Sequence, residues 1–202
     1  MKRRAGISLA GAFLAASLWS LTAYSAEDDD EKKAIKEAQQ AVLKLMDSMN
    51  GNKGDVKAQA KAIKDKFEEL KPVMWVYKKR SKGGIGMGKD GDHDIELTIG
   101  NVGNPRAKGM TPKKILTMRE DLAKVAELSR AVAAVADLYA SQYKDDNGKK
   151  DPAKWKELME KMHKGADELR KAAKGDDVAK IQKAAGNLRA SCTECHGVFR
   201  NN

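Results

Sequence analysis

Two cysteines and a histidine close to the carboxyl end carry the clearest chemical signal in the chain. The sequence there reads Cys192-Thr193-Glu194-Cys195-His196, and it holds both cysteines of the 202 residues. This is the C-x-x-C-H spacing, in which two thiols form thioethers with the vinyl groups of one porphyrin. The histidine that follows directly is then placed to bind the iron as its proximal ligand. The motif predicts one covalent haem c per chain, held by Cys192 and Cys195, with His196 on the metal.

Three other interpretations of the cysteine pair account for less of the sequence. A structural disulfide would leave His196 without a role. A thioredoxin-like redox pair opens a helix beside a βαβ unit, whereas seven residues follow Cys195 and no such unit precedes it. A zinc site needs further cysteine or histidine ligands, and the chain offers His93 and His163 alone. We therefore predict haem, and keep an exported helical module with a disulfide and no haem as the alternative.

The amino-terminal end indicates export. A positively charged start over residues 1–4 precedes an uncharged, apolar stretch over residues 5–23. Residues 23–25 match an A-x-A-like cleavage site, with Ala26 as a neighbouring alternative. We predict a cleaved signal peptide over residues 1–26 and a periplasmic mature protein, which agrees with haem attachment outside the bacterial cytoplasm. If the leader were retained, the same stretch would act as a membrane anchor.

The composition of residues 27–202 fits one basic domain. Removing the leader takes three of the 39 basic residues and none of the acidic ones, which leaves 36 against 29 and a net charge of +7. That charge suits an acidic redox partner protein, although a solvated, lysine-rich helical surface gives the same composition. The lysines are spread among Glu and Asp rather than gathered in one basic tract, which argues against nucleic acid as a partner.

Apolar residues recur at three- and four-residue steps over most of the chain, and this spacing predicts helices. The predicted helices cover residues 34–49, 55–70, 111–138, 151–169 and 177–200. Asp55, Thr111-Pro112 and Asp151-Pro152 are typical helix starts for three of them. Four or five antiparallel helices with short links predict a single all-α bundle.

Residues 80–110 differ in composition from the rest of the chain, because they hold eight of its 17 glycines. Apolar and polar residues alternate over residues 95–99, which is typical of a short strand or an extended arm. We predict that residues 80–110 form a long Gly-rich loop inserted into the bundle. A loop of this length is uncommon without a function, but the sequence does not indicate which one.

A helical bundle with C-x-x-C-H on its last helix resembles the cytochrome c prime family. The run from Cys192 to Arg200 is similar to that family's C-x-x-C-H-x-x-aromatic-Arg signature. The resemblance is specific over residues 176–200 and extends as bundle topology over residues 113–200. It implies that Phe199 is the aromatic residue of the signature and that Arg200 binds near the exposed haem edge. A cation favoured at a helix carboxyl end explains Arg200 equally well.

The sixth ligand of the iron divides that family into two kinds. A methionine suits electron transfer, whereas an open position binds small gases such as nitric oxide. Met46 and Met49 lie on the first predicted helix, where low-spin relatives place their ligand. Met74 is a candidate because residues 55–78 align with residues 177–200 so that it falls opposite the motif histidine. Each of the three is equally compatible with a flexible core filler.

The two remaining histidines are weaker candidates. His93 lies in a Gly- and Asp-rich stretch and would give a bis-histidine site if it reached the iron, but a surface position is the default. His163 lies on the polar edge of a predicted helix, where we expect it to be solvated.

The sequence therefore predicts a periplasmic carrier of single electrons rather than an enzyme, since no nucleophile with a base and no carboxylate pair stands out. The first alternative is a five-coordinate haem protein that binds nitric oxide or carbon monoxide. Members of the cytochrome c prime family often form homodimers through their first helices, so the resemblance implies a possible homodimer, although the first predicted helix is short.

Overall fold

The computed structural model describes residues 17–143 and 151–200, with side chains from residue 29 onward. This part of the chain is helical and contains no strand. Its α-helices are α1 (Ser17–Gly51), α2 (Val56–Lys66), α3 (Lys71–Met74), α4 (Ile95–Gly103), α5 (Pro112–Thr117), α6 (Arg119–Ala136), α7 (Pro152–Ala172) and α8 (Val178–Phe199). The 3₁₀ helices are η1 (Trp75–Tyr77), η2 (Arg80–Lys82) and η3 (Asp137–Gln142). The predicted all-α bundle is confirmed.

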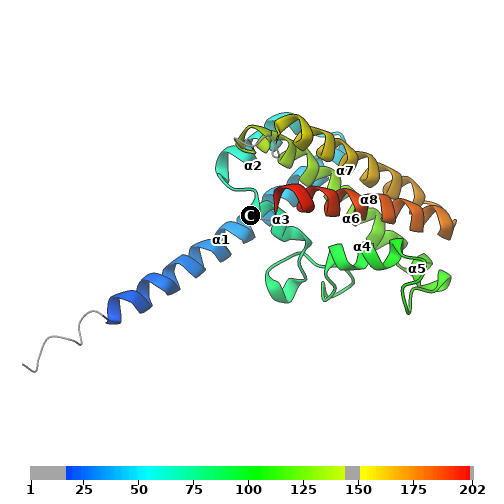
Figure 1. Cartoon of the computed structure of the whole chain (residues 1–202), viewed down its shortest axis with the longest axis horizontal. Helices are drawn as coiled ribbons and strands as arrows, with labels where there is room; N and C mark the ends of the chain where they lie inside the picture. The colour runs from blue at the N-terminus through cyan, green and yellow to red at the C-terminus, as the bar shows by residue number, and fades with distance from the viewer. Residues whose placement is uncertain (1–16, 144–150, 201–202) are drawn as a thin grey trace, which may run out of the picture.

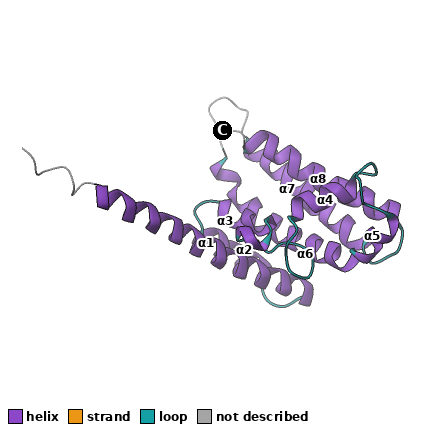
Figure 2. Cartoon of the chain, turned by 90° about the horizontal axis from the view of Figure 1, so that it is seen from below, coloured by secondary structure: helices purple, strands orange, loops and turns teal. Residues whose placement is uncertain are grey.

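The bundle is built on three long helices, α6, α7 and α8, which pack against one another in chain order. α1 covers α6, and the short helices α2 and α3 lie against α1 (Figure 1). α4 packs along α8, and in Figure 1 it lies below α8 while α7 lies above it. Figure 2 shows the same helices from below, where they overlap. α8, which carries the cysteine motif, is therefore held between α7 and α4.

Capping side chains at helix starts explain why these segments fold as they do. The carboxylate of Asp55 accepts from the N–H of Ala58 at 3.0 Å, and that of Asp177 accepts from the N–H of Lys180 at 3.1 Å. Thr111 and Asp151 cap α5 and α7 in the same way. Each cap pairs an N–H group that has no partner within its helix.

The core is apolar, with a few buried polar groups that are paired. Tyr139 is fully buried, and its hydroxyl donates to the carbonyl of Phe67 at 2.6 Å. The hydroxyl of Tyr77 donates to Ser129 Oγ at 3.1 Å. Burial raises the pKa of Tyr139 to about 12. These hydrogen bonds tie the α2–η1 region to α6 and η3.

The first helix is longer than predicted. α1 begins at Ser17 rather than at residue 34, so the expectation of a short first helix is wrong. Residues 1–16 of the predicted leader lie outside the described residues, and the helical backbone runs across the predicted boundary at residue 26. Among the described residues, no helix has the length and apolar character needed to cross a membrane.

The segment 80–110 is partly helical, which corrects the predicted strand or extended arm over residues 95–99. Asp94 caps α4 by accepting from the N–H of Leu97 at 3.2 Å. Ile95, Ile99 and Val102 follow at helical spacing, and all three are buried. The prediction of a strand is wrong because an alternation of apolar and polar residues over only five positions is also compatible with a helix. Residues 95, 99 and 102 are the i, i+4 and i+7 positions of one helical face.

The turns before α4 depend on glycine. Gly86 has φ 70°, and a Cβ built there would lie 2.0 Å from the carbonyl oxygen of Gly91. A single antiparallel bridge pairs Met87 with His93 nearby. The glycines therefore allow the chain to reverse direction tightly before α4, and α4 then packs against α8.

Candidate functional site

The cysteine motif occupies the last two turns of α8. The i, i+3 and i+4 spacing places Cys192, Cys195 and His196 on neighbouring positions of one helix face. All three residues line a single cavity of about 390 Å³, which we call the motif cavity. Its wall also includes residues from α3, η1, α4, the end of α6 and α7. The volume lies within the range of about 300–1,000 Å³ that is usual for ligand and cofactor sites.

The two thiols are free and largely enclosed. Burial raises the pKa of Cys192 to about 11, with Glu96 adding to the effect, and burial alone raises the pKa of Cys195 to about 11. A dithiol that exchanges disulfides has instead a lowered pKa, because its thiolate is the nucleophile. The surroundings of this pair are therefore unlike those of a thioredoxin-type redox site.

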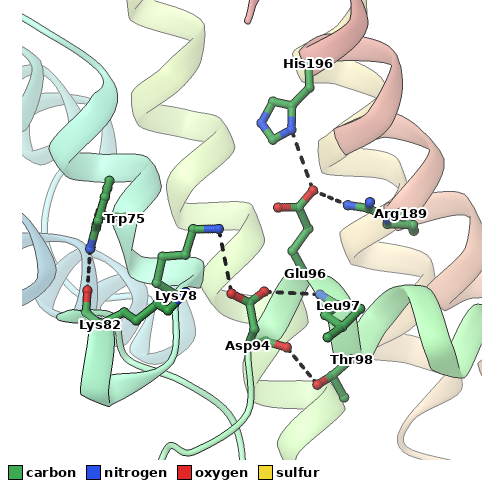
Figure 3. A network of polar contacts seen from close by, with 9 residues as sticks. All are labelled: Trp75, Lys78, Lys82, Asp94, Glu96, Leu97, Thr98, Arg189 and His196. Carbon is green, nitrogen blue, oxygen red and sulfur yellow. Dashed lines mark hydrogen bonds and ion pairs between the residues drawn. The ribbon is translucent and has the colours of Figure 1, made fainter.

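His196 is half-buried beside the thiols, and its ring contacts a carboxylate from another helix. Its Nδ1 lies 3.6 Å from Glu96 Oε1 (Figure 3). Burial lowers the pKa of His196; the carboxylate of Glu96 opposes this shift, and Arg200, Arg189 and Lys78 reinforce it. A lowered pKa favours the neutral ring, which is the form that binds a metal ion.

Of the predicted methionines, the structure brings Met74 to the motif cavity, whose wall it lines from α3. Met46 and Met49 pack on the core from α1 and do not line this cavity. The neighbour of Met49, Asn50, donates to Glu127 on α6 at 2.8 Å. The cavity meets α6 at its last residue, Ala136, about 13 Å further along the helix axis than Glu127.

Two further methionines, Met159 and Met162, line the cavity from α7. Both are buried. No pattern in the sequence indicated a role in the site, because the two methionines form part of a regular apolar stripe that predicts core packing. Only the position of α7 against α8 places their thioethers beside the motif.

An aromatic cluster closes the cavity at the carboxyl end of α8. Tyr143 stacks on Trp155 with ring centroids 3.9 Å apart, and Phe199 meets Trp155 edge-on at 4.9 Å. The indole N–H of Trp155 donates to the carbonyl of Ala136 at 2.8 Å. Phe199 is buried, as expected for core packing, and the exposed Arg200 also lines the cavity.

The other two histidines do not line the motif cavity. His93 is exposed in the turn before α4, in agreement with the default surface position. The expectation that His163 is solvated is wrong, because its side chain is half-buried on α7. Burial lowers the pKa of His163, and Arg130 adds to that effect.

A pocket of this kind fits a porphyrin bound through thioethers. The two thiols and the imidazole lie on one side, and the opposite walls are mainly aliphatic, aromatic and thioether groups. Such walls keep water away from a macrocycle. Burial away from water is one of the factors that set the reduction potential of a haem.

The comparisons with known proteins agree with this site. The family model described as Cytochrome C' matches residues 106–200, just under half of the chain. No curated protein and no solved structure matches. The predicted resemblance to the cytochrome c prime family is thus confirmed over the C-terminal region.

The family match begins after α4 and covers α5 to α8. Met46, Met49, Met74 and Glu96 therefore lie in the part of the chain that the match does not cover. The environment of the motif is built from both parts, since α3 and α4 contribute to the cavity wall.

Proposed function

We propose that this protein is an exported cytochrome that carries one haem c and transfers single electrons in the periplasm. The observation that supports it is the convergence of Cys192, Cys195 and His196 on one apolar cavity. The bound group would supply the chemistry, a one-electron Fe(III)/Fe(II) couple. The chain would supply its attachment, its ligands and a site with little water.

Each motif residue has a separate task in this proposal. Cys192 and Cys195 hold the porphyrin through thioethers. His196 ligates with Nε2, since Nδ1 faces Glu96 and the other nitrogen points away from that carboxylate (Figure 3). The aromatic cluster of Tyr143, Trp155 and Phe199 excludes water from one end.

Attachment is tested by the mass of the mature protein made in a bacterium with a c-type maturation system. We expect the mass of the chain from residue 27 onward plus one haem, and no added mass in the Cys192→Ala, Cys195→Ala double variant. A wild-type chain with bare mass would refute the proposal. A loss of two hydrogens without haem would instead support the disulfide alternative.

We propose Met74 as the sixth ligand. Its thioether lines the cavity from a short helix that continues into η1, and it is only partly buried, so it has more freedom to adjust than Met159 or Met162. Methionine ligation gives a low-spin iron suited to electron transfer.

The spin state tests this choice. We expect a low-spin reduced spectrum with a sharp α band, which Met74→Leu converts to a broad high-spin spectrum. Met159→Leu and Met162→Leu are the matched controls, and the low-spin spectrum should persist in both. A wild-type spectrum that is already high-spin and shifts with carbon monoxide would favour the gas-binding function and refute the assignment of Met74.

The basic residues around the cavity support an acidic redox partner. Lys71, Lys78 and Arg200 contribute to its wall, and the chain without its predicted leader has a net charge of +7, from 36 basic and 29 acidic residues. Such a rim should accelerate encounter with negative molecules at low salt. Reduction by a small anionic reductant should therefore slow as ionic strength rises, while reduction by a neutral one should not.

A further inference from the structure

The carboxylate of Glu96 lies beside His196, and it comes from segment 80–110, whose function the sequence does not indicate. Glu96, in the first turn of α4, places Oε1 3.6 Å from His196 Nδ1 and also pairs with Arg189 Nη1 (Figure 3). The Glu96 side chain is 20% exposed and that of His196 is 28% exposed. The contact is thus mostly shielded from water, where an electrostatic interaction is stronger than at an open surface.

The start of α4 is fixed by several contacts, so Glu96 has a defined position. Asp94 caps the helix, and its carboxylate lies 3.7 Å from Lys78 Nζ. The hydroxyl of Thr98 donates to the carbonyl of Asp94 at 2.7 Å. Figure 3 shows these contacts together with the ion pair to Arg189. Arg189 pairs with Oε1, the same carboxylate oxygen that faces His196, so the two groups share it.

α4 itself is seated on α8 by a close backbone approach. A Cβ built on Gly103 would lie 2.5 Å from the backbone nitrogen of Gly186. Ile95, Ile99 and Val102 are buried in the same helix. The distance between Glu96 and His196 is therefore determined by the packing of two helices and not by a mobile loop.

We infer that Glu96 is a positioning residue for the proximal ligand: its carboxylate, 3.6 Å from His196 Nδ1, would close to hydrogen-bond distance and accept from Nδ1 when Nε2 binds the iron. This inference rests on the proposed function, since it needs bound haem. A carboxylate on the far nitrogen fixes the tautomer and the ring orientation and makes the ligating nitrogen a stronger donor. A stronger donor favours oxidised over reduced iron. On this inference, the function of segment 80–110 is to place the carboxylate of Glu96 beside His196.

A purely structural role for Glu96 makes different predictions. An acidic residue in the first turn of a helix stabilises that helix, and its ion pair with Arg189 joins α4 to α8. Loss of those two effects alone would lower the unfolding temperature. It would leave the strength of the bond between the histidine and the iron unchanged.

The experiment compares the haem-loaded proteins with Glu96→Gln and with Glu194→Gln. Glu194 is the matched control, because it is on α8 close to His196 but pairs with Lys161 at 2.9 Å. For E96Q we expect the ratio of reduced to oxidised protein at a fixed potential to rise about tenfold, which is about 59 mV for one electron. The iron–histidine stretching frequency, measured directly after photolysis of the carbon monoxide complex, should fall. E194Q should change neither quantity.

Equal values for E96Q and wild type, or equal shifts in E96Q and E194Q, would overturn the inference. Arg189→Gln is a second test that does not depend on the folding of E96Q. It frees the carboxylate for His196, so the reduced fraction should fall and the stretching frequency should rise, and the opposite signs would overturn the inference. Absence of covalent haem from the wild-type protein would refute the proposed function instead.

Discussion

The contact between α4 and α8 can be tested with two glycines that face each other but differ in the space around them. A Cβ at Gly103 would lie 2.5 Å from the nitrogen and 2.6 Å from the Cα of Gly186. A Cβ at Gly186 would meet the carbonyl oxygen of Gly103 at 3.4 Å and its Cα at 3.9 Å. The first pair of distances requires the two backbones to separate, while the second is close to ordinary contact.

The magnitudes follow from this geometry. Forcing an extra methyl group into a packed contact costs about 1–3 kcal/mol. Alanine in place of a mid-helix glycine gains about 1 kcal/mol, and Gly103, as the last residue of α4, should gain less. We therefore expect Gly103→Ala to lose about 2 kcal/mol and Gly186→Ala to be neutral or stabilised by up to about 1 kcal/mol. For a chain of this size each kcal/mol shifts the unfolding temperature by about 2–4 °C.

Thermal and urea unfolding of the two haem-loaded variants measure the difference directly. Because G103A moves α4 away from α8, it should also reproduce part of the rise in reduced fraction expected for E96Q. If G103A were as stable as G186A, α4 would not be seated on α8 as the structure shows, and the argument for Glu96 would lose its support.

Three further outcomes test other parts of the fold. The pKa of His163 is lowered in the folded protein, so the unfolded chain takes up a proton at a higher pH than the folded one. The free energy of unfolding should therefore fall as the pH drops below about 6.5. In urea unfolding, His163→Gln should lose less of this free energy than the wild type between pH 7 and pH 5. Tyr139→Phe leaves the buried carbonyl of Phe67 without its donor and should lower the free energy of unfolding by about 1–3 kcal/mol. Asp94→Ala removes the cap of α4 and should cost about 1 kcal/mol in the same assay. An unchanged value in any of these measurements would contradict the contact concerned.

Much of the local structure could be predicted because it depends on near neighbours in the chain. Asp55, Thr111 and Asp151 signal helix starts through their own side chains, and the structure shows each as a cap. The apolar spacing of α7 and α8 depends only on the helical repeat. Local patterns failed over residues 95–99, where five residues are compatible with two periods, and at His163, whose burial depends on a neighbouring helix.

The sequence by itself determined the helical class of the fold and predicted the attachment chemistry, since C-x-x-C-H and the helical repeat are both encoded over a few consecutive residues. Only the tertiary structure decided what surrounds the motif. It brought Met74 rather than Met46 or Met49 to the cavity, and it placed Glu96 beside His196. These residues are far apart in the chain, and their meeting depends on how α3, α4 and α8 pack, which no short-range pattern specifies.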